Sequence, residues 1–159
     1  MSRRDRITMS DEEALAFLDE ERTVVCATQG PRGWPHLMPL WYVVRDGRLW
    51  AWTFAKSQKA INLERDPRAT LQVEAGETYD QLRGVMLECE VVLHHDLDVL
   101  KPLGTEILRR YTPGLGEGQP LPDGAAEAIE AQASKRVAFE FVEQRRSTWD
   151  HRKLAPGVY

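Results

Sequence analysis

Two lysines and two hydroxyl side chains lie within one short stretch of the sequence, Thr53-Phe-Ala-Lys-Ser-Gln-Lys59. The stretch joins an aromatic, strand-like run to a helix-like run, so the first helical turn has backbone N–H groups without acceptors and the positive end of the helix dipole. The hydroxyls of Thr53 and Ser57 and the ammonium groups of Lys56 and Lys59 add donors and positive charge. Such a set is typical of a phosphate site. The alternative is that both lysines are solvated residues on an exposed helix.

The elements that must position this stretch follow from the periodicity of the apolar residues. Alternating apolar and β-branched runs predict strands, and spacings of three and four predict helices. The predicted strands are 23–28, 36–44, 49–54, 68–74, 85–94 and 135–142, and the predicted helices are 10–21, 57–66, 96–111 and 123–134.

Local signals mark where several of these elements begin or turn. Ser10-Asp-Glu-Glu13 has the pattern of a capping box at a helix start, and Asp46-Gly47 is typical of a hairpin turn. Pro39 lacks an N–H group, so its strand should lie at an edge or contain a bulge. The Gly- and Pro-rich residues 112–122 predict a surface loop.

Six strands, mostly sequential and joined by hairpins, predict a mainly β fold with peripheral helices, as a six-stranded antiparallel split β-barrel. The 159 residues suffice for one domain. We therefore expect a single cofactor-binding domain over 1–159, with 1–9 and 154–159 as tails.

Composition narrows the classes of protein that the chain can belong to. A net charge of −4 disfavours a nucleic-acid partner, and no apolar run is long enough for a membrane helix. The charged N-terminus lacks the apolar core of a secretion signal, which predicts a cytoplasmic protein. Cys26 and Cys89 lie in strand-like runs and are expected to be buried free thiols.

One combination of motifs is specific. It comprises Thr53, Lys56, Ser57, Lys59, Asn62-Leu63 and Arg65-Asp66-Pro67-Arg68. With its surroundings, 35–68, this combination resembles the pyridoxamine-5'-phosphate-oxidase-like split barrels, the superfamily of flavin and deazaflavin oxidoreductases. The later segment 79–85 resembles the deazaflavin-dependent branch, and 149–153 resembles the closing segment of the family.

The resemblance implies a homodimer with cofactors in grooves at the subunit interface. In that arrangement Met38, Pro39, Leu40 and Trp41 would line the cofactor ring, Trp52 and Thr53 would continue the groove, and Lys56, Ser57 and Lys59 would hold the phosphate. Trp149 of the facing subunit is a candidate to cover the ring.

Two cofactors suit such a groove, FMN and the deazaflavin coenzyme F420. F420 carries an acidic tail that basic residues near the site could receive, namely Lys56, Arg65, Arg68 or Arg45. The resemblance of 79–85 to the deazaflavin branch and the Arg-rich composition favour F420 over FMN.

The predicted function is hydride transfer from F420 to an unsaturated small-molecule substrate. Two alternatives stay open: an FMN-dependent oxidase or reductase of the same fold, and a cofactor-binding or sequestering protein without turnover. No catalytic side chain is assigned, because the cofactor carries the chemistry; Tyr42, Tyr79, His36 and Trp149 are the groups that could face a substrate. No metal site is expected, because neighbouring strand residues His94 and His95 point to opposite faces.

Overall fold

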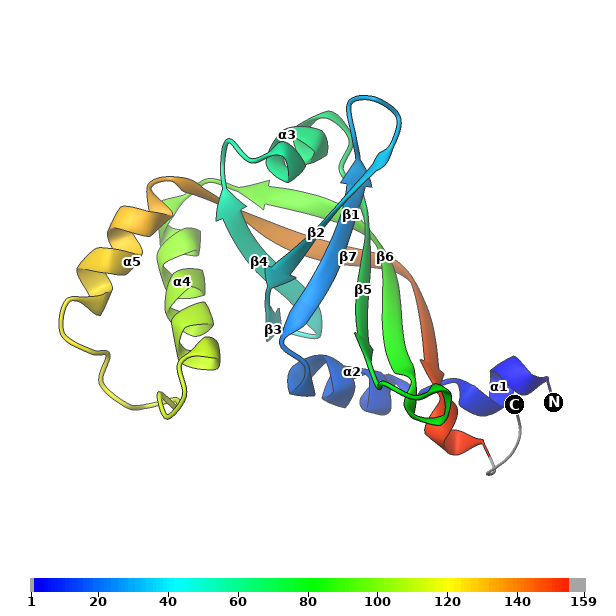
Figure 1. The fold of residues 1–159 in the computed structure, drawn as a ribbon. Coiled ribbons are helices and arrows are strands. Elements are labelled where there is room, and N and C mark those ends of the chain that lie inside the picture. The colour runs from blue at the N-terminus through cyan, green and yellow to red at the C-terminus, as the bar shows by residue number, and fades with distance from the viewer. Residues whose placement is uncertain (1, 155–159) are drawn as a thin grey trace.

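A computed structural model of the chain describes residues 2–154. Within this part of the chain, seven strands form one antiparallel sheet in the order β2-β1-β5-β6-β7-β4-β3 (Figure 1). The strands are β1 (Thr23–Gln29), β2 (Pro35–Trp41), β3 (Val43–Arg45), β4 (Arg48–Phe54), β5 (Arg68–Ala75), β6 (Arg83–His94) and β7 (Arg136–Asp150). The sheet curls into a split barrel, which confirms the predicted fold class.

The number of strands differs from the prediction because the expected strand 36–44 is two strands. β2 and β3 follow one another in the chain but lie at opposite edges of the sheet, and only Tyr42 separates them. The Tyr42 N–H donates to the Tyr111 hydroxyl at 2.8 Å instead of joining a strand ladder. The chain therefore changes direction at Tyr42 and links the two edges of the sheet.

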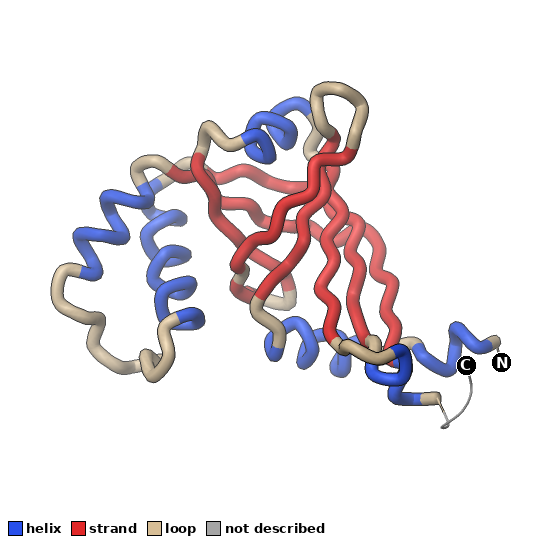
Figure 2. The backbone as a smooth tube through the Cα atoms, viewed as in Figure 1, coloured by secondary structure: helices blue, strands red, loops and turns tan. Residues whose placement is uncertain are grey.

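The helices lie outside the curled sheet (Figure 2). They are α1 (Arg3–Ile7), α2 (Asp11–Glu20), α3 (Gln58–Arg65), α4 (Leu97–Tyr111) and α5 (Ala125–Ala133), with the 3-10 turns η1 (Tyr79–Gln81) and η2 (His151–Lys153). The predicted start of α2 is confirmed, since the Ser10 hydroxyl accepts from the Glu13 N–H at 3.2 Å and the Ser10 N–H donates to the Glu13 carboxylate at 2.7 Å. α4 and α5 pack side by side against β4 and β7.

β7 extends well beyond the predicted range 135–142. Residues 136–140 pair with β4, and the strand from Ala138 onward pairs with β6 up to Asp150, opposite Arg83. The sequence 143–148 is polar and lacks apolar alternation, so its strand character comes from pairing with β6 and not from its own pattern.

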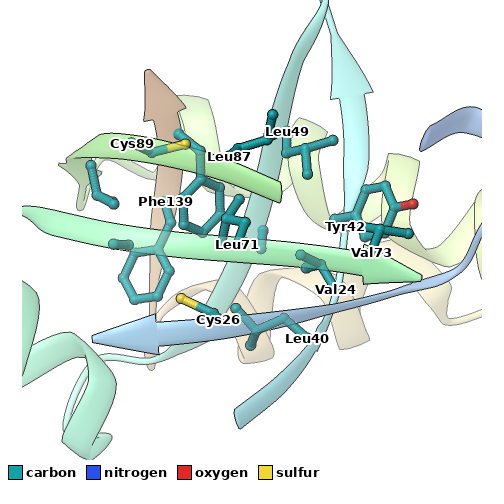
Figure 3. Packing of buried hydrophobic residues seen from close by; sticks show 14 of the residues in the cluster. Val24, Cys26, Leu40, Tyr42, Leu49, Leu71, Val73, Leu87, Cys89 and Phe139 are labelled. Atoms are coloured by element: carbon teal, nitrogen blue, oxygen red, sulfur yellow. The ribbon is translucent and has the colours of Figure 1, made fainter. Parts of the chain in front are cut away.

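The main core fills the inside of the barrel, where side chains from most of the strands meet (Figure 3). Cys26 and Cys89 are buried there as free thiols, as predicted, and burial raises the pKa of each to about 12. A smaller cluster joins α4 to the outer face of the sheet through Leu100, Leu103 and Ala138.

Both chain ends were expected to be tails. Residues 1–9 include α1, which packs against β7 and η2, and Met9 is buried with its N–H donating to the Thr148 hydroxyl at 2.9 Å. Of the second stretch, 155–159 lie outside the described residues. None of the helices in residues 2–154 is long and apolar enough to span a membrane.

Candidate functional site

α3 lies across one end of the barrel (Figure 1). The Asn62 amide donates to the Thr28 hydroxyl of β1 at 3.0 Å and holds the helix there. At the start of α3, the Ser57 hydroxyl caps the helix by accepting from the Ala60 N–H at 3.4 Å. The Thr53 hydroxyl, at the end of β4, lies 3.4 Å from the Ser57 hydroxyl. The two predicted hydroxyl groups are therefore neighbours at the N-terminus of α3.

The two lysines of the predicted phosphate site have different surroundings. Lys56 is exposed, whereas Lys59 is only 9% exposed and lies near Cys26. Burial lowers the pKa of Lys59, because the charged amine loses water. Among residues 2–154 the amine of Lys59 has no hydrogen-bond acceptor or carboxylate partner. An ammonium that has lost part of its hydration and has no partner is destabilising, so an anion bound here would be stabilising.

A second polar group without a partner lies near the start of α3. Nδ1 of His36 is buried and has no hydrogen bond within the described part of the chain. His36 shares a small pocket of about 140 Å³ with Gln58, the first residue of α3. The end of the barrel covered by α3 thus contains two unsatisfied polar side chains.

A larger pocket, of about 820 Å³, lies between the outer face of the sheet and the α4–α5 pair. Five of the residues predicted to bind the cofactor line it: Pro39, Leu40, Trp41, Trp52 and Thr53. Met38, Lys56, Ser57 and Lys59 do not, so the pocket includes most of the predicted ring site and none of the phosphate site beyond Thr53.

Aromatic side chains form the walls of this pocket. Trp41 stacks on Tyr111 with ring centroids 4.4 Å apart, and Trp52 packs against α4 at Gly104. A Cβ atom at Gly104 would lie 2.6 Å from the Trp52 ring, so only glycine permits this close approach of helix and strand. Trp41 and Phe54 are each more than half exposed at the pocket.

The sequence interpretation missed Arg136, which also lines the pocket. Its guanidinium lies 4.7 Å from the centroid of the Trp52 ring and 4.4 Å from that of Phe54. Arg136 pairs with Phe54 in the β4–β7 ladder, at a separation of 82 positions along the chain. The only local signal was a basic residue at the start of the last predicted strand, which does not reveal this pairing.

With this geometry established, comparison with known proteins identifies the family. A family model described as pyridoxamine 5'-phosphate oxidase matches residues 10–141. The chain belongs to this family. The match covers β1 to β6, the first part of β7, α3 and the residues of both sites, and confirms the predicted family.

Three solved structures are similar to this family member. A conserved hypothetical protein from Mycobacterium tuberculosis has a TM-score of 0.87 and 40% identity, over 100% of this chain and 96% of that protein. An F420 reductase has a TM-score of 0.59 and 19% identity, over 83% and 94% of the two chains. A FAD-binding protein from Mesorhizobium loti has a TM-score of 0.63 and 18% identity, over 89% of this chain and 93% of that protein. The last two similarities establish a shared fold. Comparison with curated proteins gives no match.

The other segments that resemble the family lie at the far end of the barrel from α3. β5 joins the two ends: Arg68 pairs with Glu90 near α3, and Ala75 pairs with Arg83 at the opposite end. Eight strand residues span about 23 Å. Within one chain, segments 79–85 and 149–153 are therefore too distant to contact a phosphate held by Lys59.

These distant segments have structural contacts of their own. The Trp149 ring covers Gly84, where a Cβ atom would lie 2.3 Å from the ring. Arg83 donates to the Glu20 carboxylate at 2.7 Å, and the Tyr79 ring packs against His151. Trp149 is half-buried and does not line the aromatic pocket of its own chain.

Tyr42 does not face a substrate in this structure. Its side chain is fully buried, and its hydroxyl lies 2.7 Å from the Leu18 carbonyl and 3.0 Å from the Glu21 carbonyl. Burial raises its pKa above the ordinary value, so the hydroxyl stays protonated and acts as a structural donor.

Most of the basic residues considered for an acidic cofactor tail already have partners. Arg68 pairs with Asp66 at 2.7 Å, Arg45 pairs with Glu106 at 2.7 Å, and Arg65 donates to the Gln29 carbonyl. Arg68 also holds the pKa of the Asp66 carboxyl at about 2. Lys56 is the exposed candidate at the start of α3.

His94 is the last residue of β6, and His95 follows just after the strand ends. His94 stacks on Trp50 and its Nε2 lies 3.0 Å from the Glu140 carboxylate, whereas His95 is exposed. Within residues 2–154, no group of three or more His, Cys, Asp or Glu side chains is arranged to hold a metal ion.

Proposed function

We propose that this protein is an oxidoreductase that uses coenzyme F420 for hydride transfer to an unsaturated organic substrate. The observation that carries the proposal is Lys59, whose side chain is largely buried and whose amine has no acceptor within residues 2–154, beside the hydroxyls of Ser57 and Thr53 at the N-terminus of α3. A phosphate group supplies the charge and the acceptors that these side chains lack. The residues therefore fit a phosphate-bearing cofactor.

The chain's own part in the reaction is to bind, orient and exclude water. Trp41 and Trp52 offer flat apolar surfaces in the pocket next to Thr53, so a planar ring bound there would lie against aromatic walls. When bound, F420 supplies the hydride, and no side chain of this protein is required to form a covalent bond.

Two further functions share these observations. FMN also carries a phosphate, so Lys59 does not discriminate between FMN and F420, and an FMN-dependent oxidase or reductase is the first alternative. A cofactor-binding protein without turnover is the second. The resemblance of 79–85 to the deazaflavin branch favours F420, and the shared fold with an F420 reductase is consistent with it.

We also propose that the protein is a homodimer. β2 is an edge strand whose apolar side chains are exposed on both faces: Leu37 is 57% exposed and Met38 is 41% exposed. Trp34, in the loop before β2, is 75% exposed. A second copy that covers this edge would remove these surfaces from water. It could also bring the Trp149 end of one subunit to the α3 end of the other.

Cofactor titration tests the proposal. Purified protein would be titrated with F420 and, separately, with FMN, and binding would be followed by cofactor fluorescence. Lys59→Met retains the apolar length of the side chain and removes the charge, and should weaken binding by about 1.5–3 kcal/mol, the range for a hydrogen bond to a charged group. Lys56→Met is the matched control and should have a smaller effect, because Lys56 is exposed.

The outcomes separate the three functions. Binding of FMN alone would assign the protein to the flavin group. Binding of F420 without reduction of any compound in a panel of unsaturated substrates would favour a binding protein. Absence of binding to both cofactors would contradict the proposed function.

A further inference from the structure

We infer that the pocket between β4 and the α4–α5 pair binds an aromatic or otherwise apolar organic acid, with Arg136 as the anchor for its carboxylate. The assignment of this acid as the substrate rests on the proposed function. The binding itself depends only on the pocket.

The hydrogen bonding of Arg136 is incomplete. Its Nη2 donates to the Gln132 side chain at 3.1 Å, and its Nε is buried without a partner. No residue within 2–154 accepts a hydrogen bond from Nη1 or contributes a carboxylate. Arginine binds carboxylates through two parallel hydrogen bonds, so this guanidinium has unused capacity for an oxyanion.

Other half-buried arginines in the chain contrast with Arg136. Four of them face a carboxylate at 2.7–2.9 Å. They are Arg45 with Glu106, Arg83 with Glu20, Arg110 with Asp19, and Arg146 with Glu143. Arg136 is instead held between the rings of Trp52 and Phe54 and next to a neutral amide. An exogenous carboxylate would give Arg136 the acidic partner that Asp or Glu gives the other four.

The walls of the pocket define the rest of the ligand. They contain aromatic, aliphatic and small side chains and no Asp or Glu, so Arg136 is the only charged residue lining the pocket among the described residues. A volume of about 820 Å³ is within the range of small-molecule sites. An apolar body with one negative charge therefore matches both the walls and the anchor.

The anchor is distinct from the proposed phosphate site. Successive residues of β4 point to opposite faces of the sheet, so Phe54 and its partner Arg136 lie on the outer face, beneath the helices. Thr53 and its partner Val137 are buried and face the barrel, as Lys59 does near Cys26. The two cations therefore lie on different faces of the sheet, although Thr53 also borders the pocket. The acid would share this pocket with the cofactor ring that we place against Trp41 and Trp52.

Binding can be tested on the cofactor-free protein with trans-cinnamate and its neutral isostere, cinnamamide. Calorimetry would give the affinities, and two-dimensional NMR would follow the indole N–H signals of Trp41 and Trp52. We expect cinnamate to bind about tenfold or more tightly than cinnamamide and to shift both indole signals, because only cinnamate forms a charge-assisted pair with Arg136. Equal affinities, absence of cinnamate binding, or unchanged indole signals would overturn the inference.

Two variants test whether Arg136 is the residue that binds the carboxylate. Arg136→Met retains much of the packing between the rings and should remove the preference for cinnamate. Arg145→Met is the matched control: it makes the same change on the same strand, at a residue outside the pocket whose nearest carboxylate is 3.8 Å away. An equal loss in both variants would contradict the assignment to Arg136.

A parallel F420 titration separates this inference from the proposed function. Retained F420 binding by Arg136→Met supports a separate substrate anchor, and weakening of F420 binding equal to that of cinnamate would assign Arg136 to the cofactor and overturn the substrate assignment. If cinnamate binds through Arg136 while neither F420 nor FMN binds, the pocket stands and the proposed function fails.

Discussion

The two cysteines are buried in the core by strands whose pairing places their side chains inside the barrel. Burial disfavours the thiolate, so the pKa of each is raised to about 12. The reactive form of cysteine is the thiolate. The native protein should therefore contain no reactive thiol among the residues that the structure describes.

This leads to a pH-dependent prediction. At pH 8 neither Cys26 nor Cys89 should react with Ellman's reagent in the native protein, and both should react in urea. The pKa of each thiol is higher in the folded state than its ordinary value of 9.0. Between pH 9 and 12 the native state therefore binds more protons than the unfolded state. The free energy of unfolding should fall as pH rises through this range. Rapid reaction of one thiol without denaturant would contradict their burial.

At the scale of elements, Arg110 of α4 caps the C-terminal end of α2. The Arg110 guanidinium donates to the carbonyls of Leu18, Asp19 and Glu21 at 3.2, 2.8 and 2.9 Å, respectively. The last carbonyls of a helix have no partner within the helix, so this arginine supplies donors that α2 lacks. The arrangement connects two helices that are far apart in sequence.

Removal of this cap should destabilise the protein. Arg110→Met should lower the free energy of unfolding by about 2–3 kcal/mol, because several hydrogen bonds to a charged group are lost together. Arg109→Met is the matched control and should cost less, because Arg109 donates to the loop carbonyls of Gly116 and Gln119. Urea denaturation measures both changes, and an equal cost would show that the cap is not specific.

Strand β6 contains a second contact that depends on one residue. The Trp149 ring lies over Gly84, and Gly84→Ala would place a Cβ atom 2.3 Å from that ring. We expect this variant to lose about 1–3 kcal/mol of stability, as is usual for overpacking. Gly116→Ala serves as the control, since a Cβ atom there has no neighbour within 4 Å. If Gly84→Ala is as stable as the wild type, Trp149 can move without cost.

At the scale of the whole molecule, the sheet is closed by the chain itself through Tyr42, yet β2 keeps exposed apolar side chains. The proposed dimer would cover them. Leu37→Lys introduces a charge at this edge and should convert the dimer to a monomer in analytical ultracentrifugation. Leu97→Lys changes a similarly apolar and exposed residue at the start of α4 and should leave the dimer intact. A monomeric wild-type protein would contradict the dimer.

Local sequence determined the features that depend on neighbours in the chain. The start of α2 follows from Ser10 and Glu13, and the turn between β3 and β4 follows from Asp46 and Gly47, which adopt positive φ angles of 49° and 74°. The proposed phosphate motif at α3 also depends on adjacent residues, so the sequence alone is enough to bring its hydroxyl groups together.

The tertiary structure decided the features that depend on pairing between distant residues. The division of 36–44 at Tyr42 requires Tyr111, and the length of β7 requires β6. Lys59 and Lys56 both fit the motif, but only Lys59 is largely buried. Strand register places Arg136 opposite Phe54. A sequence pattern records which side chains are near in the chain, whereas burial and charge pairing depend on which backbones meet after folding.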